Sequence, residues 1–248
     1  METQTPPHFA APNTGRMLDY WLGGSHHSPI DVTAAQAFEA VLPQFPEIFR
    51  VLRAFIGRAS RHIREHGVER FLVLGAGVPT QGNVHEAVPG ARVLYTDLDP
   101  ENVETGKRLL AGVPNVGYAF CDAADLATLD RAEVERVLGS SGPLGIIMIG
   151  VAAFIEDARL RATFQALYDL APAGSFLAFD FDGTEGKNYP ELLEMMGDEF
   201  RMHSPEEFAP LLGPWKVTDE GIQPVSEWRD PGAEPFPPFM YGGVAVKE

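Results

Sequence analysis

The sequence predicts an α/β fold with a mostly parallel sheet and helices on both faces. Short apolar runs alternate with helical patterns through the middle of the chain, which is typical of βαβ units. The last quarter then carries two strand patterns without a clear helix between them, so these strands pair antiparallel or lie apart. We therefore expect a seven-stranded sheet that ends in an antiparallel C-terminal strand pair.

Five of the expected strands are near-continuous apolar runs, as in strands that are buried on both faces. Right-handed crossovers between them place helices on both sides of the sheet. The expected strands are 70–74, 91–96, 116–121, 144–149 and 175–181, followed by 215–225 and 239–246. The expected helices of this part are 80–88, 100–111, 131–138, 157–170 and, after a capping box at Ser204, 204–212.

The N-terminal part differs, and we expect residues 1–66 to form a tail and a helical cap on a ligand-binding domain over 67–248. The cap and the domain are expected to make one compact unit. Residues 1–14 are rich in Pro, Thr and Asn, as in a loose tail. Three helices follow over 14–22, 31–42 and 46–66, and the last has apolar residues at i, i+3 and i+4 spacing.

The composition argues against several classes of partner. The net charge of −16, from 19 basic and 35 acidic residues, repels a nucleic-acid backbone. The basic residues between Arg50 and Arg70 alternate with apolar ones, as on a solvated helix face. No run approaches the ~18 apolar residues of a membrane helix. We expect no signal peptide, because residues 1–15 have neither a basic start nor an apolar region. The single Cys121 fits a cytoplasmic location. Because nucleic acid and membrane are disfavoured, a small molecule is the expected partner. The oligomeric state is left open.

The stretch FLVLGAGVPTQGNVHE, residues 71–86, passes from a strand into a glycine-containing turn. Open parallel sheets bind ligands beyond the carboxyl ends of their strands, and Gly75 and Gly77 let the backbone approach such a ligand closely. Asp97 ends the second strand twenty-two residues after Gly75, where a carboxylate can accept hydrogen bonds from ribose hydroxyls. Asp99 is expected to cap the helix that starts at Pro100. Together these positions predict a nucleotide-containing cofactor.

Two longer motifs resemble those of a known family. The stretch Arg16–Gly24, RMLDYWLGG, is similar to its signature R-x-x-D-Y-x-L-G-G, and TQGNVHE, residues 80–86, is similar to a second signature. The family is the bacterial S-adenosyl methyltransferase family, first catalogued as a domain of unknown function. Residues 224–229 and 241–244 fit as well, so the resemblance extends from about Pro12 to the C-terminus. It implies a Rossmann-like class I methyltransferase fold, bound S-adenosylmethionine and S-adenosylhomocysteine as the product.

The resemblance also implies roles for the strand ends and the N-terminal motif. Asp122 would face the adenine amino group, and the methionine portion of the cofactor would lie over the end of the fourth strand. Arg16 would meet the cofactor carboxylate and Tyr20 would lie against the cofactor, with a hinge at Gly24. The expected cofactor-binding residues are Gly75, Ala76, Gly77, Asp97, Leu98, Asp122, Ala123, Gly150, Val151, Arg16, Tyr20 and Gly24.

The chain departs from the family pattern at several positions. Val73 stands where members usually carry an acid in the first strand, Ala153 stands where many have histidine, and residues 23–28 read GGSHHS in place of G-G-K-D-N-F. The expected function remains methyl transfer from S-adenosylmethionine to an unidentified small molecule. Val73 and Ala153 motivate an alternative, a catalytically impaired protein that binds the cofactor or its product in a sensor or interaction role. A nicotinamide-dependent oxidoreductase is disfavoured, because Thr80 replaces the third glycine of a dinucleotide loop and is expected to begin a helix.

Methyl transfer is an in-line displacement that depends mainly on positioning the reactants, so it needs no catalytic dyad. The catalytic residues are therefore left unassigned, with Tyr20, His26 and His85 as candidates that could also serve only in packing. No metal site is expected, because His26 and His27 with Asp31 lack a fourth ligand.

Overall fold

A single mixed sheet forms the centre of the computed structural model, which describes residues 11–234 and 236–248. Most of the expected N-terminal tail therefore lies outside the described residues. The strands lie in the order β3-β2-β1-β4-β5-β8-β6, and β7 also pairs with β8. The strands are β1 (Arg70–Leu74), β2 (Arg92–Asp97), β3 (Val116–Phe120), β4 (Gly145–Met148), β5 (Phe176–Asp182), β6 (Lys216–Val217), β7 (Gln223–Pro224) and β8 (Met240–Val246).

Strands β1 to β5 are parallel, and β8 runs antiparallel to β5, which confirms the expected fold. The expected strand over 215–225 is instead two short strands, β6 and β7, that both pair with β8. A turn separates them, in which the Gly221 amide donates to the Thr218 carbonyl at 2.9 Å and Gly221 has a φ of +72°. The described sheet thus has eight strands where seven were expected.

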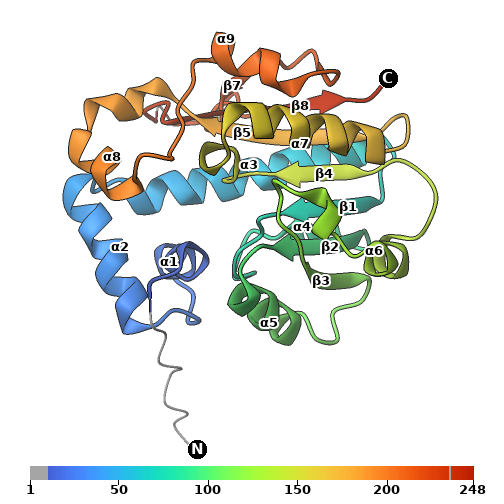
Figure 1. Cartoon of the computed structure of the whole chain (residues 1–248), viewed down its shortest axis with the longest axis horizontal. Coiled ribbons are helices and arrows are strands. Elements are labelled where there is room, and N and C mark those ends of the chain that lie inside the picture. The colour runs from blue at the N-terminus through green and yellow to red at the C-terminus, as the bar shows by residue number, and fades with distance from the viewer. Residues whose placement is uncertain (1–10, 235) are drawn as a thin grey trace, which may run out of the picture.

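Helices cover both faces of the sheet (Figure 1). The faces carry separate apolar clusters, one beneath α3 and the other beneath α7. In β1 the side chains alternate between them, because successive residues of a strand point to opposite faces. The helices are α1 (Thr14–Trp21), α2 (Pro29–Val41), α3 (Phe45–Glu65), α4 (Val84–Ala87), α5 (Pro100–Leu109), α6 (Arg131–Leu138), α7 (Asp157–Leu170), α8 (Pro190–Met196) and α9 (Pro205–Phe208).

The helix expected to begin at Thr80 begins only at Val84. Gly82 has a φ of +68°, a left-handed conformation that is not compatible with a right-handed α-helix at this position. Asn83 then caps α4, and Glu86 completes a capping box with it. The residues before Asn83 therefore remain an extended loop beside the sheet, and Thr80 has a different role, described below.

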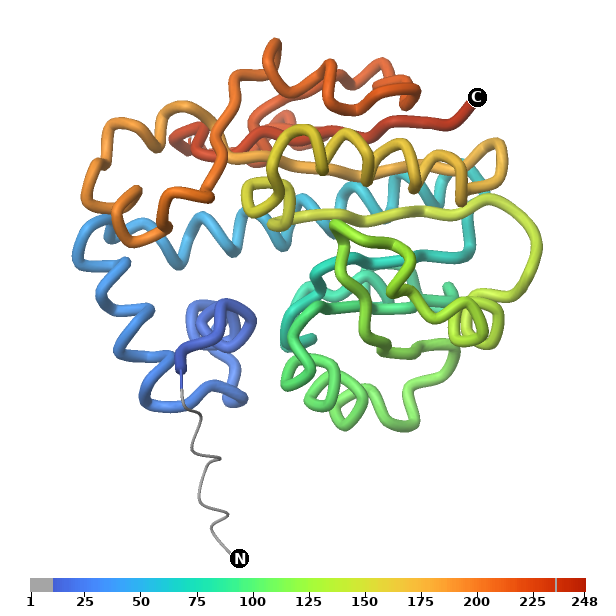
Figure 2. The backbone as a smooth tube through the Cα atoms, viewed as in Figure 1, coloured from blue at the N-terminus to red at the C-terminus, as the bar shows by residue number. Residues whose placement is uncertain are grey.

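Helices α1 and α2 lie at the end of the sheet to which the parallel strands point, whereas α3 runs along the sheet (Figure 1). Helix α1 contacts α2 and α3, and α2 contacts α8. The tube trace shows the same arrangement, with the first helices and the segment around α8 at one end of the molecule (Figure 2). Helices α1 and α2 therefore lie where a ligand of the sheet would bind, whereas α3 packs on a face of the sheet. The division into a cap over 1–66 and a domain over 67–248 stays a prediction.

Strand β5 carries a buried acid next to the end of β4. Asp180 is 1% exposed, and its Oδ1 atom accepts a hydrogen bond of 2.8 Å from the Gly150 amide. Within the described residues its Oδ2 atom has no hydrogen-bond partner. Burial raises the pKa of Asp180 to about 7, although the Gly150 hydrogen bond acts in the opposite direction.

The raised pKa of Asp180 predicts that this residue lowers the free energy of unfolding as the pH rises. Between about pH 4 and pH 7 the folded protein holds a proton that the unfolded chain has lost, so the free energy of unfolding falls as pH rises. Asp180→Asn removes this titration, and its stability relative to the parent protein should improve by roughly 2–4 kcal/mol from acidic to neutral pH. Urea unfolding across this range measures the effect, with exposed Asp219→Asn as the control. A difference that does not change with pH would contradict the prediction.

Candidate functional site

A cavity of about 930 Å³ lies at the carboxyl ends of the parallel strands. The loops after β1, β2, β3, β4 and β5 contribute to its wall, together with α1, α3 and α8. The strand-end residues expected to bind a cofactor all line it. They are Gly75, Ala76, Gly77, Asp97, Leu98, Asp122, Ala123, Gly150 and Val151.

Asp97 organises the loops after β1 and β2. Its Oδ2 atom accepts the Gly77 amide at 2.8 Å, and its Oδ1 atom accepts the Asp99 amide at 2.9 Å and the Asn102 side chain at 3.2 Å. A carboxylate has about four lone-pair directions, so Asp97 retains capacity to accept from a ligand hydroxyl. Asp99 caps α5 by accepting the Glu101 amide, as expected.

The glycines of the first loop allow a close approach of the N-terminal helix. Gly75 and Gly77 both have a φ of +64°, a conformation that favours glycine. A Cβ atom on Gly77 would lie 3.3 Å from the Cα atom of Gly15 in α1. The loop after β1 is thus packed between the sheet and the cap.

The cavity mouth at β2 and β3 combines apolar and acidic side chains. Leu98 and Phe154 are 58% and 52% exposed, which is unusual for large apolar side chains and suits a planar ring between them and the wall. Asp122 Oδ1 accepts the Ala124 amide at 2.8 Å, and Asp122 Oδ2 lies 3.4 Å from the Arg159 guanidinium. Asp122 therefore acts in the local turn as well as lining the cavity.

A buried carboxylate joins the two sequence motifs. Asp19 is fully buried, and it accepts hydrogen bonds from the His26 amide at 2.7 Å, from the His27 ring at 2.8 Å and from the Thr80 hydroxyl. Gly24 lies directly against this carboxylate, where a Cβ atom would overlap Asp19. Thr80 thus ties the loop after β1 to the cap, and Gly24 provides the space for that contact rather than lining the cavity.

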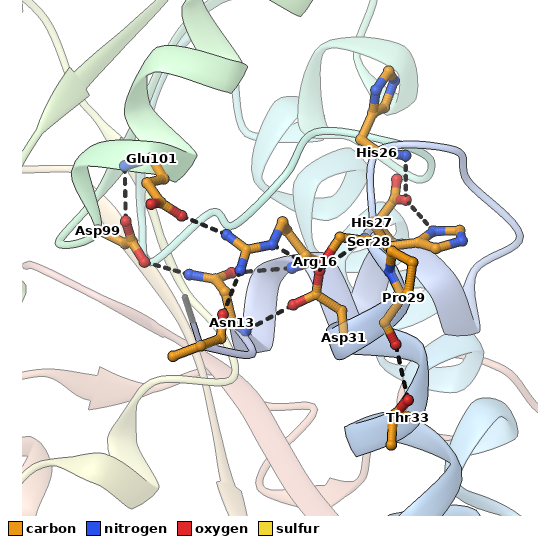
Figure 3. A network of polar contacts seen from close by, with 12 residues as sticks. Asn13, Arg16, His26, His27, Ser28, Pro29, Asp31, Thr33, Asp99 and Glu101 are labelled. Carbon is orange, nitrogen blue, oxygen red and sulfur yellow. Dashed lines mark hydrogen bonds and ion pairs between the residues drawn. The ribbon is translucent and has the colours of Figure 1, made fainter. Parts of the chain in front are cut away.

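Arg16, expected at the cofactor carboxylate, lies in a separate network that Figure 3 shows. Its Nε atom lies 2.8 Å from Asp31 Oδ2, a second guanidinium nitrogen lies 2.6 Å from Glu101, and a third donates to the Ala11 carbonyl at 2.8 Å. Asn13, the cap of α1, binds Asp31 and Asp99 in the same network. Arg16 does not line the cavity, so it joins α1, α2 and α5 and we do not place it at the cofactor.

Tyr20, His26 and His85 also lie outside the cavity lining. Tyr20 packs edge-on against His27, with ring centroids 5.3 Å apart, and the His26 ring points away from the network in Figure 3. His85 Nδ1 lies 2.8 Å from the Tyr95 hydroxyl, and burial lowers the pKa of His85. None of these three side chains therefore faces the cavity in which a substrate would react.

The two family departures lie in different surroundings. Val73 is 7% exposed, lines the cavity and belongs to the apolar cluster beneath α3. Ala153 is buried in a short 3₁₀ helix (Ala152–Phe154), where its carbonyl accepts the Arg201 amide at 2.8 Å. Val73 makes the cavity wall more apolar, whereas Ala153 has a structural position.

Beyond the strand ends the cavity continues into an apolar chamber. Helices α1, α3 and α8 and the segment after α8 supply its side chains, and Asp182 and Met240 from the ends of β5 and β8 also line the cavity. The chamber is lined by Trp21, Phe49, Leu193, Met195, Met196, Phe200 and Met202. The unbranched side chains of Met195 and Met196 can adapt to ligands of different shape.

Sequence reasoning missed two residues that line the cavity. Arg53 was assigned to a solvated helix face, an interpretation that suits Arg50 at 57% exposure but is wrong for Arg53. Asp182, the last residue of β5, follows directly on the expected strand over 175–181 and was given no role. The available signal was the acid itself, since the carboxyl ends of parallel strands meet at one edge of a sheet.

The sheet order, the antiparallel β8 and the cavity at the strand ends are those of the class I methyltransferases. The model of the S-adenosyl methyltransferase family matches residues 3–248, and the chain belongs to this family. It is therefore an S-adenosylmethionine-dependent methyltransferase, and the resemblance found in the sequence is confirmed. Neither of the alternatives, a sensor or an oxidoreductase, is favoured by these comparisons.

Solved structures agree with this assignment. A Thermobifida fusca protein, provisionally assigned as a methyltransferase, shares 26% identity, with 100% of each chain covered and a TM-score of 0.88. A DUF574 family protein from Streptomyces avermitilis shares 26% identity over 96% of this chain and 98% of that one, with a TM-score of 0.86. Magnesium protoporphyrin IX methyltransferase from Synechocystis, solved with bound S-adenosylhomocysteine, has 13% identity, covers 94% and 93%, and its TM-score of 0.58 supports the fold alone. No curated protein matches the chain.

The described residues show neither a metal-binding cluster nor a membrane-spanning helix. No group of three or more His, Cys, Asp or Glu side chains there is placed to hold a metal ion. None of the helices in that part of the chain is long and apolar enough to cross a membrane.

The Arg16 network predicts unequal effects for its two acids. Asp31 is fully buried, and although burial acts to raise its pKa, hydrogen bonds from Arg16, Ser28 and Asn13 outweigh this and lower it. Asp31→Ala removes the buried carboxylate that pairs with Arg16 and accepts the Asn13 and Ser28 amides, and should lower the free energy of unfolding by about 3–5 kcal/mol.

Glu101 provides the matched control, because its side chain is 55% exposed and binds the same arginine. Glu101→Ala should cost under about 1 kcal/mol in the same urea titration. Equal losses for the two variants would contradict the interpretation of Arg16 as a buried structural cation.

Proposed function

We propose that the protein transfers the methyl group of S-adenosylmethionine to a small, largely apolar molecule bound in the chamber beside α8. The observation that carries this proposal is that one cavity joins the strand-end residues to the chamber. Its volume is near the upper end of the range for small-molecule sites. A cofactor over the strand ends leaves the apolar part of the cavity for the acceptor.

The residues at the strand ends fit the cofactor. In the proposed arrangement Asp97 accepts from the ribose hydroxyls, Asp122 faces the adenine amino group, and Leu98 covers the adenine ring. Gly75 and Gly150 give the amino acid portion room against the backbone. When bound, the cofactor supplies an activated methyl group on sulfur. The chain holds the acceptor in line with that methyl and keeps water away from it.

Asp182 is our candidate for proton transfer on the acceptor side. It lines the cavity at the end of β5, two residues beyond Asp180 on the same face of the strand. Burial, and secondarily the neighbouring Asp180, raises the pKa of Asp182, which makes its carboxylate a stronger base once it is ionised. It would receive the proton that an acceptor hydroxyl or amine releases when its heteroatom bonds to the methyl carbon.

A cytoplasmic location also stays a prediction, based on the single cysteine.

The cofactor site predicts a loss of affinity when Asp97 is replaced. Asp97→Ala removes the ribose acceptor and should weaken binding of S-adenosylhomocysteine by about 1–3 kcal/mol in calorimetric titration. Asp130→Ala is the control, because Asp130, like Asp97, accepts hydrogen bonds from two backbone amides but does not line the cavity. An unchanged dissociation constant for Asp97→Ala, in a variant that remains folded, would place the cofactor elsewhere.

The chamber predicts a small acceptor rather than a macromolecule. When the protein is incubated with cell extract and methyl-labelled S-adenosylmethionine, the label should appear in the small-molecule, solvent-extractable fraction. The Asp97→Ala variant should lower this signal at limiting cofactor. Label found mainly in protein or nucleic acid would contradict the proposed class of acceptor.

A further inference from the structure

Arg53 is a cation inside the cavity that the described structure does not pair. It lies on α3 between Phe49 and Ile56, which line the cavity on the same face of the helix. Its electrostatic neighbours are Tyr95, Tyr118 and Glu86, but within the described residues its guanidinium has no hydrogen bond or ion pair. Burial lowers the pKa of Arg53, yet an arginine keeps its charge under all ordinary conditions.

The stem of Arg53 fixes it beside the loop that follows β1. A Cβ atom on Gly82 would lie 3.1 Å from the Cβ atom of Arg53, so the loop packs directly on this side chain. The Tyr118 hydroxyl, one of its electrostatic neighbours, donates to the Gly77 carbonyl at 2.6 Å. Arg53 is therefore held next to the glycine turn of the cofactor site.

The other charged residues of the cavity do not neutralise it. Arg159, the second arginine of the lining, is already 3.4 Å from Asp122. Within the described residues, none of the lining acids forms an ion pair with Arg53; these acids are Asp97, Asp99, Asp122 and Asp182. Glu86 is near enough to act on Arg53 electrostatically, but a partly buried guanidinium that makes no hydrogen-bonded ion pair costs free energy, which an anion entering the cavity would offset. The cavity thus presents an anion-binding group next to the first strand end.

The backbone amides of Ala76 and Gly77, in the loop after β1, do not supply an anion-binding group of their own. The Ala76 amide donates to the Thr96 carbonyl at 2.9 Å and the Gly77 amide donates to Asp97 at 2.8 Å, so neither is available to a ligand carboxylate. A guanidinium can pair with a carboxylate through two parallel hydrogen bonds. The cofactor of the proposed function carries one carboxylate, on its amino acid portion.

We propose that Arg53 binds the carboxylate of S-adenosylmethionine and so positions the amino acid portion against Gly75 and Gly77. This inference depends on the proposed placement of the cofactor over the strand ends. It assigns to α3 of the cap a part of the cofactor site, in place of Arg16, whose guanidinium is bound to Asp31 and Glu101.

Calorimetric titration with a matched pair of ligands tests it. S-Adenosylhomocysteine carries the carboxylate, and its decarboxylated analogue keeps the adenosine, the sulfur and the amine. Arg53→Met should weaken binding of S-adenosylhomocysteine about 10- to 100-fold and leave the analogue within about 2-fold. Arg53→Gln, which keeps a polar stem, should discriminate in the same way and serves if the Met variant does not fold.

Arg50→Met is the control on the same helix, because Arg50 is 57% exposed and pairs with Glu47. It should leave both affinities unchanged. Equal weakening of both ligands by Arg53→Met would make Arg53 a structural residue, and unchanged S-adenosylhomocysteine binding would remove it from the site, so either result overturns the inference. If the parent protein binds neither ligand, the proposed cofactor placement itself fails.

Discussion

The buried Asp19 carboxylate is the interaction on which the rest of the site depends. A carboxylate that is fully removed from water must be satisfied by hydrogen bonds, and Asp19 takes them from the exit of α1 and from Thr80 in the loop after β1. This holds the cap against the sheet edge and gives the cavity one of its walls. The two family motifs are therefore two halves of one contact, which explains why the motif around Gly24 requires a residue without a side chain.

The cavity formed in this way has two chemically different parts. Acids from the ends of β2 and β3 and the cation Arg53 surround the strand-end part, which suits a polar, zwitterionic cofactor. Methionines, aromatics and leucines surround the other part, and Asp182 lies at its edge. Val73, which departs from the family acid, belongs to the wall and adds apolar surface without blocking the site. The departure alters the lining but leaves the arrangement for methyl transfer intact.

Much of this was predictable from local sequence, and the limits have physical causes. The strands β1 to β5 were placed within about a residue at each end, because strands buried on both faces must be apolar along their length. Asp97 and Asp122 could be predicted to lie at one site because the strand ends of a parallel sheet converge, and both line the cavity. By contrast, the partner of Asp19 lies 61 residues away in the chain, and nothing local signals that contact. Arg53 was missed for a similar reason, since helical periodicity identifies the face of a helix but not the cavity it borders.

A structure with bound S-adenosylhomocysteine would test the central claim most directly. We predict that its ribose lies on Asp97, its carboxylate lies beside α3, and its sulfur faces the apolar chamber near α8. The hydrogen bond between Asp19 and Thr80 should persist, with the cap closed over the ligand. A product bound outside the cavity, or a sulfur turned away from the chamber toward solvent, would contradict this account.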